Sequence, residues 1–501
     1  MPSPVPRSTA PFAPFAPARA SLLVLSDVHL GSDIVEGSSL SAPARSKSVD
    51  EDLRAMLDHY RETRHGAEPW HLVINGDFID FIGISIAAGV AGRAVSTEPS
   101  PEEHAHGLGT AEDHASIKLA RVAERHGAVF ESLAAFVGAG HRLTIVPGNH
   151  DREFHWDRIK DEFCAILLDA APRSTLHSVL DSGEFLARIQ FSPWFFWLEG
   201  VAYIEHGHQY DTFCATENVM TPLSPVDPRR LSAGFTEVLL RFVVHQTRGL
   251  GQHGHDKMGL VDYITLAIGL GVRGGIDLGT RYVRAIAELF RLRRSLFGDL
   301  AKALEREHDR RVALLGEATR IGMHRLRALA ALQVPPVTRS IRGILSSLLV
   351  DELALACLSL GTLVSIGSLS AFTGHRGPFV WASAALVLVL WALGHRYLSR
   401  TRHVDPGRLL LDRAAPLGRL FPAAFVVMGH THVPMRTAVG EGTTTYINTG
   451  SWAEDEGTKR DAPIAHRATR THLVIRVGDA GPEAELLAWD SAEGPRRFAF
   501  G

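Results

Sequence analysis

The sequence is poor in cysteine and carries almost no net charge. Only three cysteines, Cys164, Cys214 and Cys357, occur among its 501 residues, and none forms a CxxC pair. Neither a disulfide framework nor a zinc site built on thiolates is therefore supported. The 52 Lys and Arg residues against 55 Asp and Glu give no global electrostatic reason for wrapping nucleic acid or coating an acidic surface.

The N-terminal segment lacks the pattern of a signal peptide. Residues 1–20 are rich in Pro and Ala and contain no continuous apolar run of seven or more residues. Such a segment does not form the apolar core of a secretion signal. We expect a disordered tail over residues 1–20, with ordered structure from Ser21.

Short apolar runs rich in β-branched residues recur along the chain, and each has the length of a buried strand. They lie at 21–26, 70–75, 142–147, 201–206, 424–429, 443–448 and 471–477. Helical patterns lie between the early runs, for example at 48–64, where Ser48 as N-cap and Glu51 three residues later would form a capping box. Alternating strands and helices predict a layered α/β domain.

The alternation stops near residue 215 and resumes near residue 421. We therefore predict an α/β domain in two parts, 21–215 and 421–501, around an all-α insertion at 216–420. The first half of the insertion is basic, since residues 281–342 carry 14 Lys and Arg against 6 Asp and Glu. This stretch is either a solvated helical face or a surface for anionic lipid.

Two long segments of the insertion lack charged residues. Leu353–Gly374 has 22 residues without Asp, Glu, Lys or Arg, and Gly377–Gly394 has another 18. Each is about long enough to cross the hydrocarbon layer of a membrane. The pair predicts a transmembrane helical hairpin near 353–374 and 377–394, and the alternative is a buried hairpin inside a large soluble domain.

The charges that flank the hairpin predict its orientation. Arginines lie outside both segments, at Arg339, Arg342, Arg396, Arg400 and Arg402. By the positive-inside rule both outer ends face the cytoplasm. We expect a multi-pass protein of the cell inner membrane, with the catalytic domain cytoplasmic and the loop at 375–376 on the far side.

Five short polar motifs follow, or end, five of the predicted strands. They are SDVH at 26–29, GDFID at 76–80, GNHD at 148–151, HGH at 206–208 and GHTH at 429–432. Loops at the carboxyl ends of neighbouring strands converge on one crevice, so these residues should meet there. Asp, His and Asn are ligands for Mn²⁺, Fe²⁺ or Zn²⁺. The motifs therefore predict a site for divalent metal ions.

In this order the motifs DxH, GDxxD, GNH(D/E), a single His and GHxH resemble those of the calcineurin-like metallophosphoesterase superfamily. The resemblance covers 21–215 and 421–501, and it includes YINTGS at 446–451, which is similar to the NxGS segment of that family. It implies a four-layer αββα sandwich. It also implies a dinuclear metal-dependent hydrolase of a phosphomonoester, phosphodiester or pyrophosphate.

The resemblance implies seven metal ligands and two divalent cations. One cation would be held by Asp27, His29 and His432, the other by Asn149, His206 and His430, with Asp77 bridging them. Two such cations clamp a phosphate and lower the pKa of a water molecule enough to give the attacking hydroxide. Mn²⁺ is the first expectation, with Fe²⁺ and Zn²⁺ as alternatives.

Other residues of the motifs are candidates for catalysis and positioning. In the family the position of His150 contacts phosphate or protonates the leaving oxygen, a task that suits an imidazole. Asp151 and Asp80 would orient His150 or a ligand imidazole, or serve as turn residues. Arg152 could meet phosphate oxygens, and His208 could lie near the second metal, although both also fit ordinary structural roles.

Residues 83–126 contain no strand-like run. Their polar side chains could form a cap over the metals or, as the default, an ordinary solvated loop. These side chains belong to Glu102, Glu103, His104, His106, Asp113 and His114.

The sequence leaves the substrate open. SDVHL and GHTH resemble the UDP-2,3-diacylglucosamine pyrophosphatases, but those proteins have Arg at the position of His150 and His-Gly-Asp at 206–208. The motifs and the hairpin also agree with a soluble phosphoesterase that oligomerises through its hairpin, or with a catalytically idle metal-binding membrane scaffold. Nucleic acid is a less favoured substrate, for which 281–342 would be the place to look. The oligomeric state and the role of 216–350 are not determined by the sequence.

Overall fold

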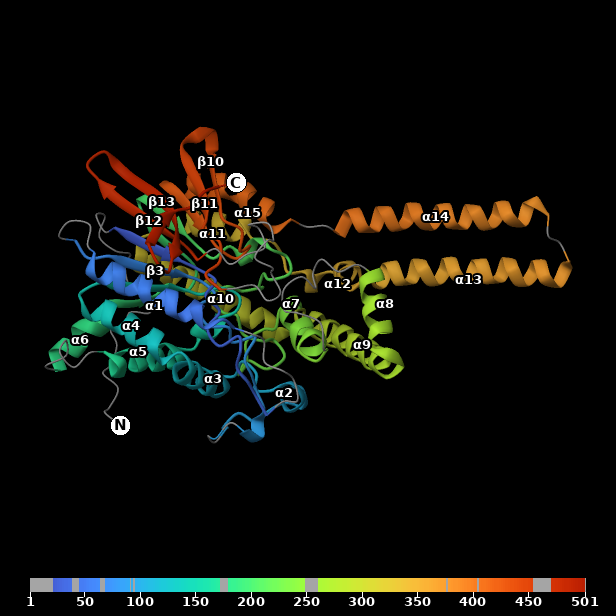
Figure 1. Cartoon of the computed structure of the whole chain (residues 1–501), viewed down its shortest axis with the longest axis horizontal. Helices are drawn as coiled ribbons and strands as arrows, with labels where there is room; N and C mark the ends of the chain where they lie inside the picture. The colour runs from blue at the N-terminus through green and yellow to red at the C-terminus, as the bar shows by residue number, and fades with distance from the viewer. Residues whose placement is uncertain are drawn as a thin grey trace.

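The computed structural model describes residues 21–37, 45–63, 68–90, 92, 95–171, 179–247, 260–374, 377–402, 405–453 and 470–500. The predicted tail over 1–20 and the loop at 375–376 lie outside these residues. Within them the protein is a mixed α/β structure with a seven-stranded and a five-stranded sheet (Figure 1). All seven predicted strands are present.

The seven-stranded sheet joins the two ends of the chain. Its order is β14 (Gly494–Arg497), β13 (Gly481–Asp490), β12 (Thr471–Gly478), β1 (Leu22–Leu25), β3 (His71–Asn75), β5 (Arg142–Val146) and β6 (Ile189–Phe191). The strands β1, β3, β5 and β6 are parallel, whereas β12 pairs antiparallel with β1. The polar motifs that follow β1, β3 and β5 therefore lie at one edge.

The five-stranded sheet brings together strands on either side of the insertion. Its order is β10 (Met435–Val439), β11 (Thr444–Asn448), β9 (Ala423–Met428), β8 (Gly200–Ile204) and β7 (Phe196–Leu198). In the centre β8 and β9 run parallel, with Ile204 opposite Val427. HGH after β8 and GHTH after β9 are thereby placed side by side.

Alternating side chains explain how the two sheets pack. Leu22 and Val24 of β1 face the other sheet and share a buried apolar cluster with Ile204 and Val427. Leu23, the residue between, points the opposite way into a second cluster. Successive side chains of a strand point to opposite faces, so a strand buried on both faces is apolar throughout.

Helices cover both outer faces. The seven-stranded sheet packs against α1 (Lys47–Glu62), α3 (Glu112–Arg125), α4 (Gly127–Gly138) and α5 (Asp157–Ala170). The five-stranded sheet packs against α10 (Asp299–Thr319), α11 (Met323–Leu332) and α15 (Pro406–Leu420). Three helices of the predicted insertion at 216–420, namely α10, α11 and α15, thus form part of the outer layer on the five-stranded sheet. The predicted domain boundaries stay a prediction.

The start of α1 differs from the prediction. The N-cap is Ser46, whose side chain accepts a hydrogen bond from the backbone N–H of Ser48, and Ser48 already lies in the helix. The predicted Ser48 cap with Glu51 was therefore wrong by two residues. Ser46 has the extended backbone that an N-cap requires.

The insertion also builds a separate apolar cluster. It forms among α7 (Phe235–Leu239), the π-helical turn Leu240–Val244, α8 (Leu260–Gly269), α9 (Gly271–Ser295) and α12 (Ile341–Ser347). The remaining short elements are β2 (Val35–Glu36), β4 (Ser85–Ile86), α2 (Pro101–His106), α6 (Val179–Ala187) and the 3₁₀ turns Ala88–Val90, Arg152–His155, His208–Tyr210, Val337–Arg339 and Gly440–Gly442.

Two long helices project from the body as an antiparallel hairpin (Figure 1). They are α13 (Val350–Thr373) and α14 (Pro378–Arg402). Both are long and apolar enough to cross a membrane, and the apolar window of each is 0% buried in the protein. The helices were predicted near 353–374 and 377–394, so their existence is confirmed, while α14 extends further at its C-terminal end.

Candidate metal centre

The strand ends bring the predicted ligands together. His206 Nε2 lies 3.2 Å from Asp77 Oδ2, and His432 Nε2 lies 3.1 Å from Asp27 Oδ1. His29 Nε2 is 3.9 Å from Asp77 Oδ2. These residues come from the loops after β1, β3, β8 and β9, so the two sheets contribute jointly to one site.

Four sets of side chains among the described residues have the spacing of metal ligands: one joins His150 to His29 and Asp77, one contains Asp211, and the other two consist of predicted ligands alone. Asp27, His29 and His432 form one set, and Asp27, Asp77 and His206 form another, with the ligand atoms of each set within 4.8 Å of one another. Both sets are composed of groups that bind divalent cations of intermediate hardness. Buried Asp and His clusters that could hold metal ions are therefore present.

The last two predicted ligands lie beside these sets. Asn149 Oδ1 is 3.2 Å from His206 Nε2. The backbone N–H of His430 contacts Asp27 Oδ2 at 3.3 Å, and the His430 ring lies 5.3 Å from that of His206 between centroids. All seven predicted ligands are thus gathered in one place.

Five of the seven ligands have a left-handed backbone. The φ angles are 57° for Asp27, 51° for His29, 54° for Asp77, 69° for His430 and 60° for His432. Non-glycine residues adopt this region at a cost, and such residues cluster where the surrounding structure holds a functional side chain in place. The unusual backbone is thus shared by residues whose side chains lie close together.

Glycines allow the loops to approach one another closely. A Cβ at Gly148 would lie 2.1 Å from Asp77 Oδ1, and one at Gly429 would lie 2.6 Å from Asp27 Oδ2. Real Cβ atoms do not approach heavy atoms this closely. The glycines of GNH and GHTH therefore leave room for the two carboxylates.

The two carboxylates among the predicted ligands, Asp27 and Asp77, both have a pKa below the ordinary value. Burial alone would raise the pKa of Asp77, but His206 and His150 hold it well below its ordinary value. Burial opposes a charge on the His206 imidazole, yet Asp77 raises the pKa of His206 to about 9. Asp77 and His206 thus favour each other's charged form, as oppositely charged neighbours do in a buried site.

One ring nitrogen of the described site, Nε2 of His29, is free to bind a cation. His29 Nε2 is buried and has no hydrogen-bond partner among the described residues. Burial and the neighbouring His150 lower the pKa of His29 to about 3, so its imidazole is neutral, as a metal ligand must be. Two carboxylates, neutral imidazole and an amide oxygen are a donor set that suits Mn²⁺, Fe²⁺ or Zn²⁺.

His150 lies at the edge of the site with a carboxylate behind it. Its Nδ1 is 2.7 Å from Asp80 Oδ1, and its ring meets that of His29 edge-on at 4.7 Å between centroids. Burial disfavours the imidazolium, but Asp80 and Asp77 raise the pKa of His150 to about 9. Asp80 therefore orients the His150 ring and favours its protonated form. Asp80 and Asp151 were the two carboxylates that the sequence offered for this role.

Asp151 and Arg152 are directed elsewhere. The Asp151 carboxylate accepts hydrogen bonds from the backbone N–H groups of Gly148 and Phe78, at 2.6 and 2.8 Å. The side chain of Arg152 donates to the carbonyl of Asn149 at 3.2 Å and to Glu237 Oε2 at 2.6 Å. Asp151 thus joins two loops, and Arg152 supports the Asn149 loop from behind.

His208 is buried beside two of the ligand imidazoles. Its ring centroid lies 5.5 Å from that of His206 and 6.4 Å from that of His430. Burial, together with these neighbours, holds the pKa of His208 well below its ordinary value. A neutral imidazole is therefore placed behind the ligands.

The sequence interpretation missed Asp211. Its Oδ2 lies 3.1 Å from His430 Nε2, and Asp211, Cys214 and His430 form a further group whose ligand atoms lie within 4.8 Å of one another. The only signal was an acidic residue five positions after His206 on the same loop. Asp211 fixes the orientation of the His430 ring.

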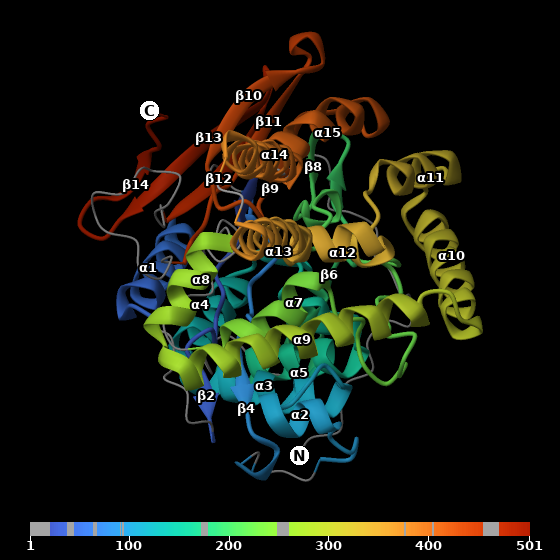
Figure 2. The same cartoon turned by 90° about the vertical axis from the view of Figure 1, so that its right-hand side faces the viewer.

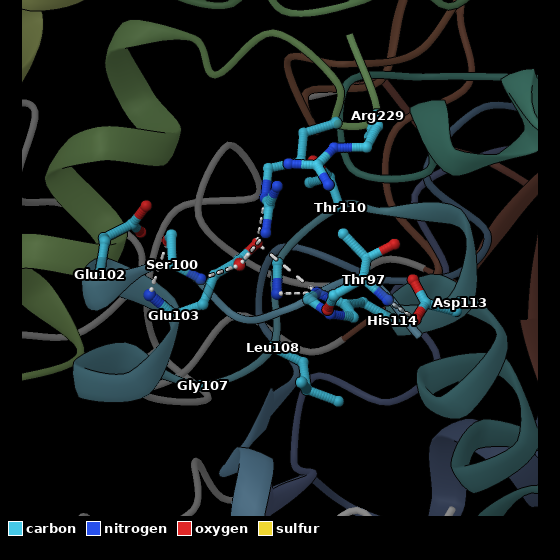
Figure 3. A network of polar contacts seen from close by, with 12 residues as sticks. Thr97, Ser100, Glu102, Glu103, Gly107, Leu108, Thr110, Asp113, His114 and Arg229 are labelled. Atoms are coloured by element: carbon cyan, nitrogen blue, oxygen red, sulfur yellow. Dashed lines mark hydrogen bonds and ion pairs between the residues drawn. The ribbon is translucent and has the colours of Figure 1, made fainter. Parts of the chain in front are cut away.

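Residues 83–126 are not a solvated loop. They form α2 and α3, and Glu103 closes a capping box with Ser100 at the start of α2. Glu103 Oε2 also accepts a hydrogen bond from Arg230 at 2.6 Å, and Glu103 Oε1 lies 3.5 Å from His114 Nδ1 (Figure 3). Burial alone would raise the pKa of Glu103, but Arg230 and His114 hold it well below its ordinary value.

The same network uses the other candidate residues of this region. Asp113 accepts hydrogen bonds from the backbone N–H groups of Ser96 and Thr97, each at 2.8 Å (Figure 3). Glu102 pairs with Arg241 at 2.7 Å. Glu102 and Glu103 thus join α2 to the start of the insertion, and Asp113 joins α3 to the segment before α2, so these contacts give the carboxylates a structural role.

Comparison of the chain with protein-family models and with curated proteins finds no match. The function is therefore argued from the residues of the site and from their geometry.

Proposed function

We propose that the protein is a dinuclear metal-dependent phosphoesterase of the calcineurin-like type. The observation that carries the proposal is the meeting of seven predicted ligands, from five motifs and both sheets, at one cluster of strand ends. Two packed sheets with helices on both outer faces agree with the αββα sandwich expected of that family. Five of these ligands have a left-handed backbone, a conformation that clusters at active sites and at sites that clamp a ligand.

The proposed ligand assignment follows the motifs. One divalent cation would be held by Asp27, His29 and His432, the other by Asn149, His206 and His430, and Asp77 would lie between them. When bound, the two cations would supply Lewis-acid polarisation of a phosphate and an activated water as the nucleophile. Mn²⁺ is the first cation to test, followed by Fe²⁺ and Zn²⁺.

His150 supplies the proton for the leaving group in this proposal. Its Nδ1 is occupied by Asp80, so Nε2 is the nitrogen available to a substrate oxygen. A pKa of about 9 keeps the ring protonated at neutral pH, as a general acid requires. Asp80 holds the ring in position, and the backbone N–H of His150 donates to Asp77 Oδ1 at 2.8 Å, which links the acid to the central carboxylate.

We further propose that α13 and α14 cross the cell inner membrane and leave the catalytic domain in the cytoplasm. Their apolar surfaces are not buried in the protein, and arginines lie before α13, at Arg339 and Arg342, and in the last turns of α14, at Arg396, Arg400 and Arg402. An anchored enzyme gains most from a lipid-linked substrate. A UDP-2,3-diacylglucosamine-type pyrophosphatase therefore stays an alternative, although His150 and His208 depart from the pattern of those enzymes.

The test is hydrolysis of p-nitrophenyl phosphate and bis-p-nitrophenyl phosphate by metal-stripped full-length protein refilled with Mn²⁺. Asp77→Ala should bind less metal and lose activity. Asp299→Ala, at a fully exposed carboxylate of α10, is the matched control and should keep both. The ratio between the two esters separates monoesterase from diesterase chemistry.

Two results would count against the proposal. Equal activity of Asp77→Ala and Asp299→Ala would remove the metal centre from the reaction. Full metal loading without hydrolysis of either ester or of a nucleotide-linked pyrophosphate would favour the idle metal-binding scaffold.

A further inference from the structure

The helix α9 has two apolar faces, and one of them is exposed. Leu278, Leu289 and Leu292 are buried in the cluster that joins α9 to α7 and α12. On the opposite face Val272 is 83% exposed and Val283 is 66% exposed. A surface helix normally needs one apolar stripe to pack on its protein, so the second stripe has no role within the described chain.

The exposed face continues into neighbouring residues. Ile276, one turn after Val272, is 64% exposed, and Ile268 at the end of α8 is 75% exposed. We define the α8–α9 face as Ile268, Val272, Ile276 and Val283. Large apolar side chains grouped in this way mark an interaction surface.

The position of α8 and α9 favours one partner for this face. Figure 1 shows α8 beside the base of α13, and Figure 2, viewed from the hairpin side, shows α8 and α9 on the side of the body from which α13 and α14 project. With the hairpin across a bilayer, that side of the body faces the membrane surface. The α8–α9 face would then continue the apolar surface of the hairpin along the lipid boundary.

The charges beside the face fit the same partner. On a helix with 3.6 residues per turn, Arg273, Arg284 and Arg291 lie along one flank of the Val272–Val283 stripe, and all three are exposed. Arg291 also pairs with Glu288 at 2.5 Å, and Asp277 shares the flank, so Arg273 and Arg284 are the arginines of this flank without an ion pair among the described residues. An apolar stripe bordered by arginines is the pattern of a helix lying in the interface of an anionic membrane. Along α9 as a whole six arginines outnumber two acidic residues, an excess that favours a negatively charged partner over a second copy of the same basic surface.

We propose that the α8–α9 face docks on the surface of an anionic lipid bilayer, with α9 lying in the headgroup region. The inference rests on the proposed crossing of the membrane by α13 and α14 but not on the phosphoesterase reaction. It goes beyond a membrane anchor, because it fixes how the catalytic body is held against the lipid.

The experiment measures contact with lipid at single labelled positions in the full-length protein reconstituted in vesicles. Cys357, exposed on α13, is replaced by Ser in every variant, and this background protein is the baseline. An environment-sensitive fluorophore is attached at Val272→Cys, at Leu386→Cys in the middle of α14, or at Ala187→Cys. Ala187 is exposed on α6, which lies at the opposite end of the long axis from the hairpin (Figure 1).

Quenching by brominated lipids is then compared in phosphatidylcholine vesicles with and without phosphatidylglycerol. We expect strong quenching at Leu386 and at Val272, roughly two-fold or more above Ala187, with the Val272 signal increased by the anionic lipid. Quenching at Leu386 but not at Val272 would overturn the docking while leaving the hairpin in the membrane. Absence of quenching at both would overturn the membrane crossing and the docking together. A Val272 label shielded from water but insensitive to brominated lipid would indicate a second copy of the chain and would also refute the proposal.

Discussion

Adding one methyl group at Gly148 should disable the metal centre. The Cβ of Gly148→Ala would lie 2.1 Å from Asp77 Oδ1 and 2.7 Å from the backbone nitrogen of Asp77, where 3.0 Å is the shortest separation that real Cβ atoms show. The carboxylate must therefore retreat by about 1 Å, a displacement that costs on the order of 100-fold in rate at a reacting centre. Because the backbone nitrogen cannot rotate away, the loops after β3 and β5 must also separate.

The cost in stability should be small beside the effect on function. Overpacking a tight site typically costs about 1–3 kcal/mol, so the variant should still fold. The measurement is the Mn²⁺ content per chain and the rate of p-nitrophenyl ester hydrolysis, with the thermal midpoint as a check on folding. Gly183→Ala in α6, where a Cβ would meet nothing within 4 Å, is the matched control. Full metal content and activity in a folded Gly148→Ala protein would refute the close contact between Gly148 and Asp77 on which the prediction rests.

Three further predictions concern titratable side chains, two beside the site and one, His71, at the opposite end of β3. Asp80→Asn removes the carboxylate that raises the pKa of His150. The alkaline limb of the rate–pH profile should therefore move to lower pH, and the rate should fall about 10–100-fold. An unchanged profile would show that His150 is not the general acid. Glu237→Ala leaves the buried Arg152 without its carboxylate and should destabilise the protein by about 3–5 kcal/mol, whereas an unchanged thermal midpoint would show that the pair is not buried. Burial lowers the pKa of His71 from 6.5 to about 3. Between these two values the unfolded chain binds more protons than the folded protein, so the free energy of unfolding should decrease as the pH falls toward 3. In thermal unfolding scans His71→Gln should show a smaller decrease, and an equal decrease would contradict the assignment.

The strands and the ligand set could be predicted because both depend on local patterns. A run such as SLLVLS predicts a buried strand by its composition, and the polar motif after it follows the strand to its carboxyl end. The convergence of Asp27 with Asp77 then follows from the rule that parallel strands direct their ends to one edge, whereas Asp27 and His432 follow strands of different sheets and meet because the two sheets pack face to face. The strand order predicted that the motifs would meet, and the assignment of seven particular ligands came from the resemblance of the motifs to those of a known family.

The remaining parts of the site depend on contacts between distant segments. Asp211 acquires its role only from His430, which lies 219 positions away, so its own surroundings in the sequence carry no signal. Glu103 and His114 have the composition of a solvated loop, and their burial depends on Arg230 of the insertion. Charged and polar residues are usually exposed unless a partner is buried with them. The composition of one segment does not reveal a partner in another, so buried pairs look like solvated residues in the sequence.

The position of the insertion between β8 and β9 also sets an order of events during synthesis. His206 leaves the ribosome before the insertion, and His430 and His432 leave it afterwards, so the ligand set is incomplete while residues 216–420 are being made. At about 5–20 residues per second, this interval lasts on the order of 10–40 seconds. With α13 and α14 in the bilayer as proposed, delivery to the membrane precedes the completion of β9 and its pairing with β8. The protein would therefore acquire its full metal-binding capacity only once it has reached its membrane.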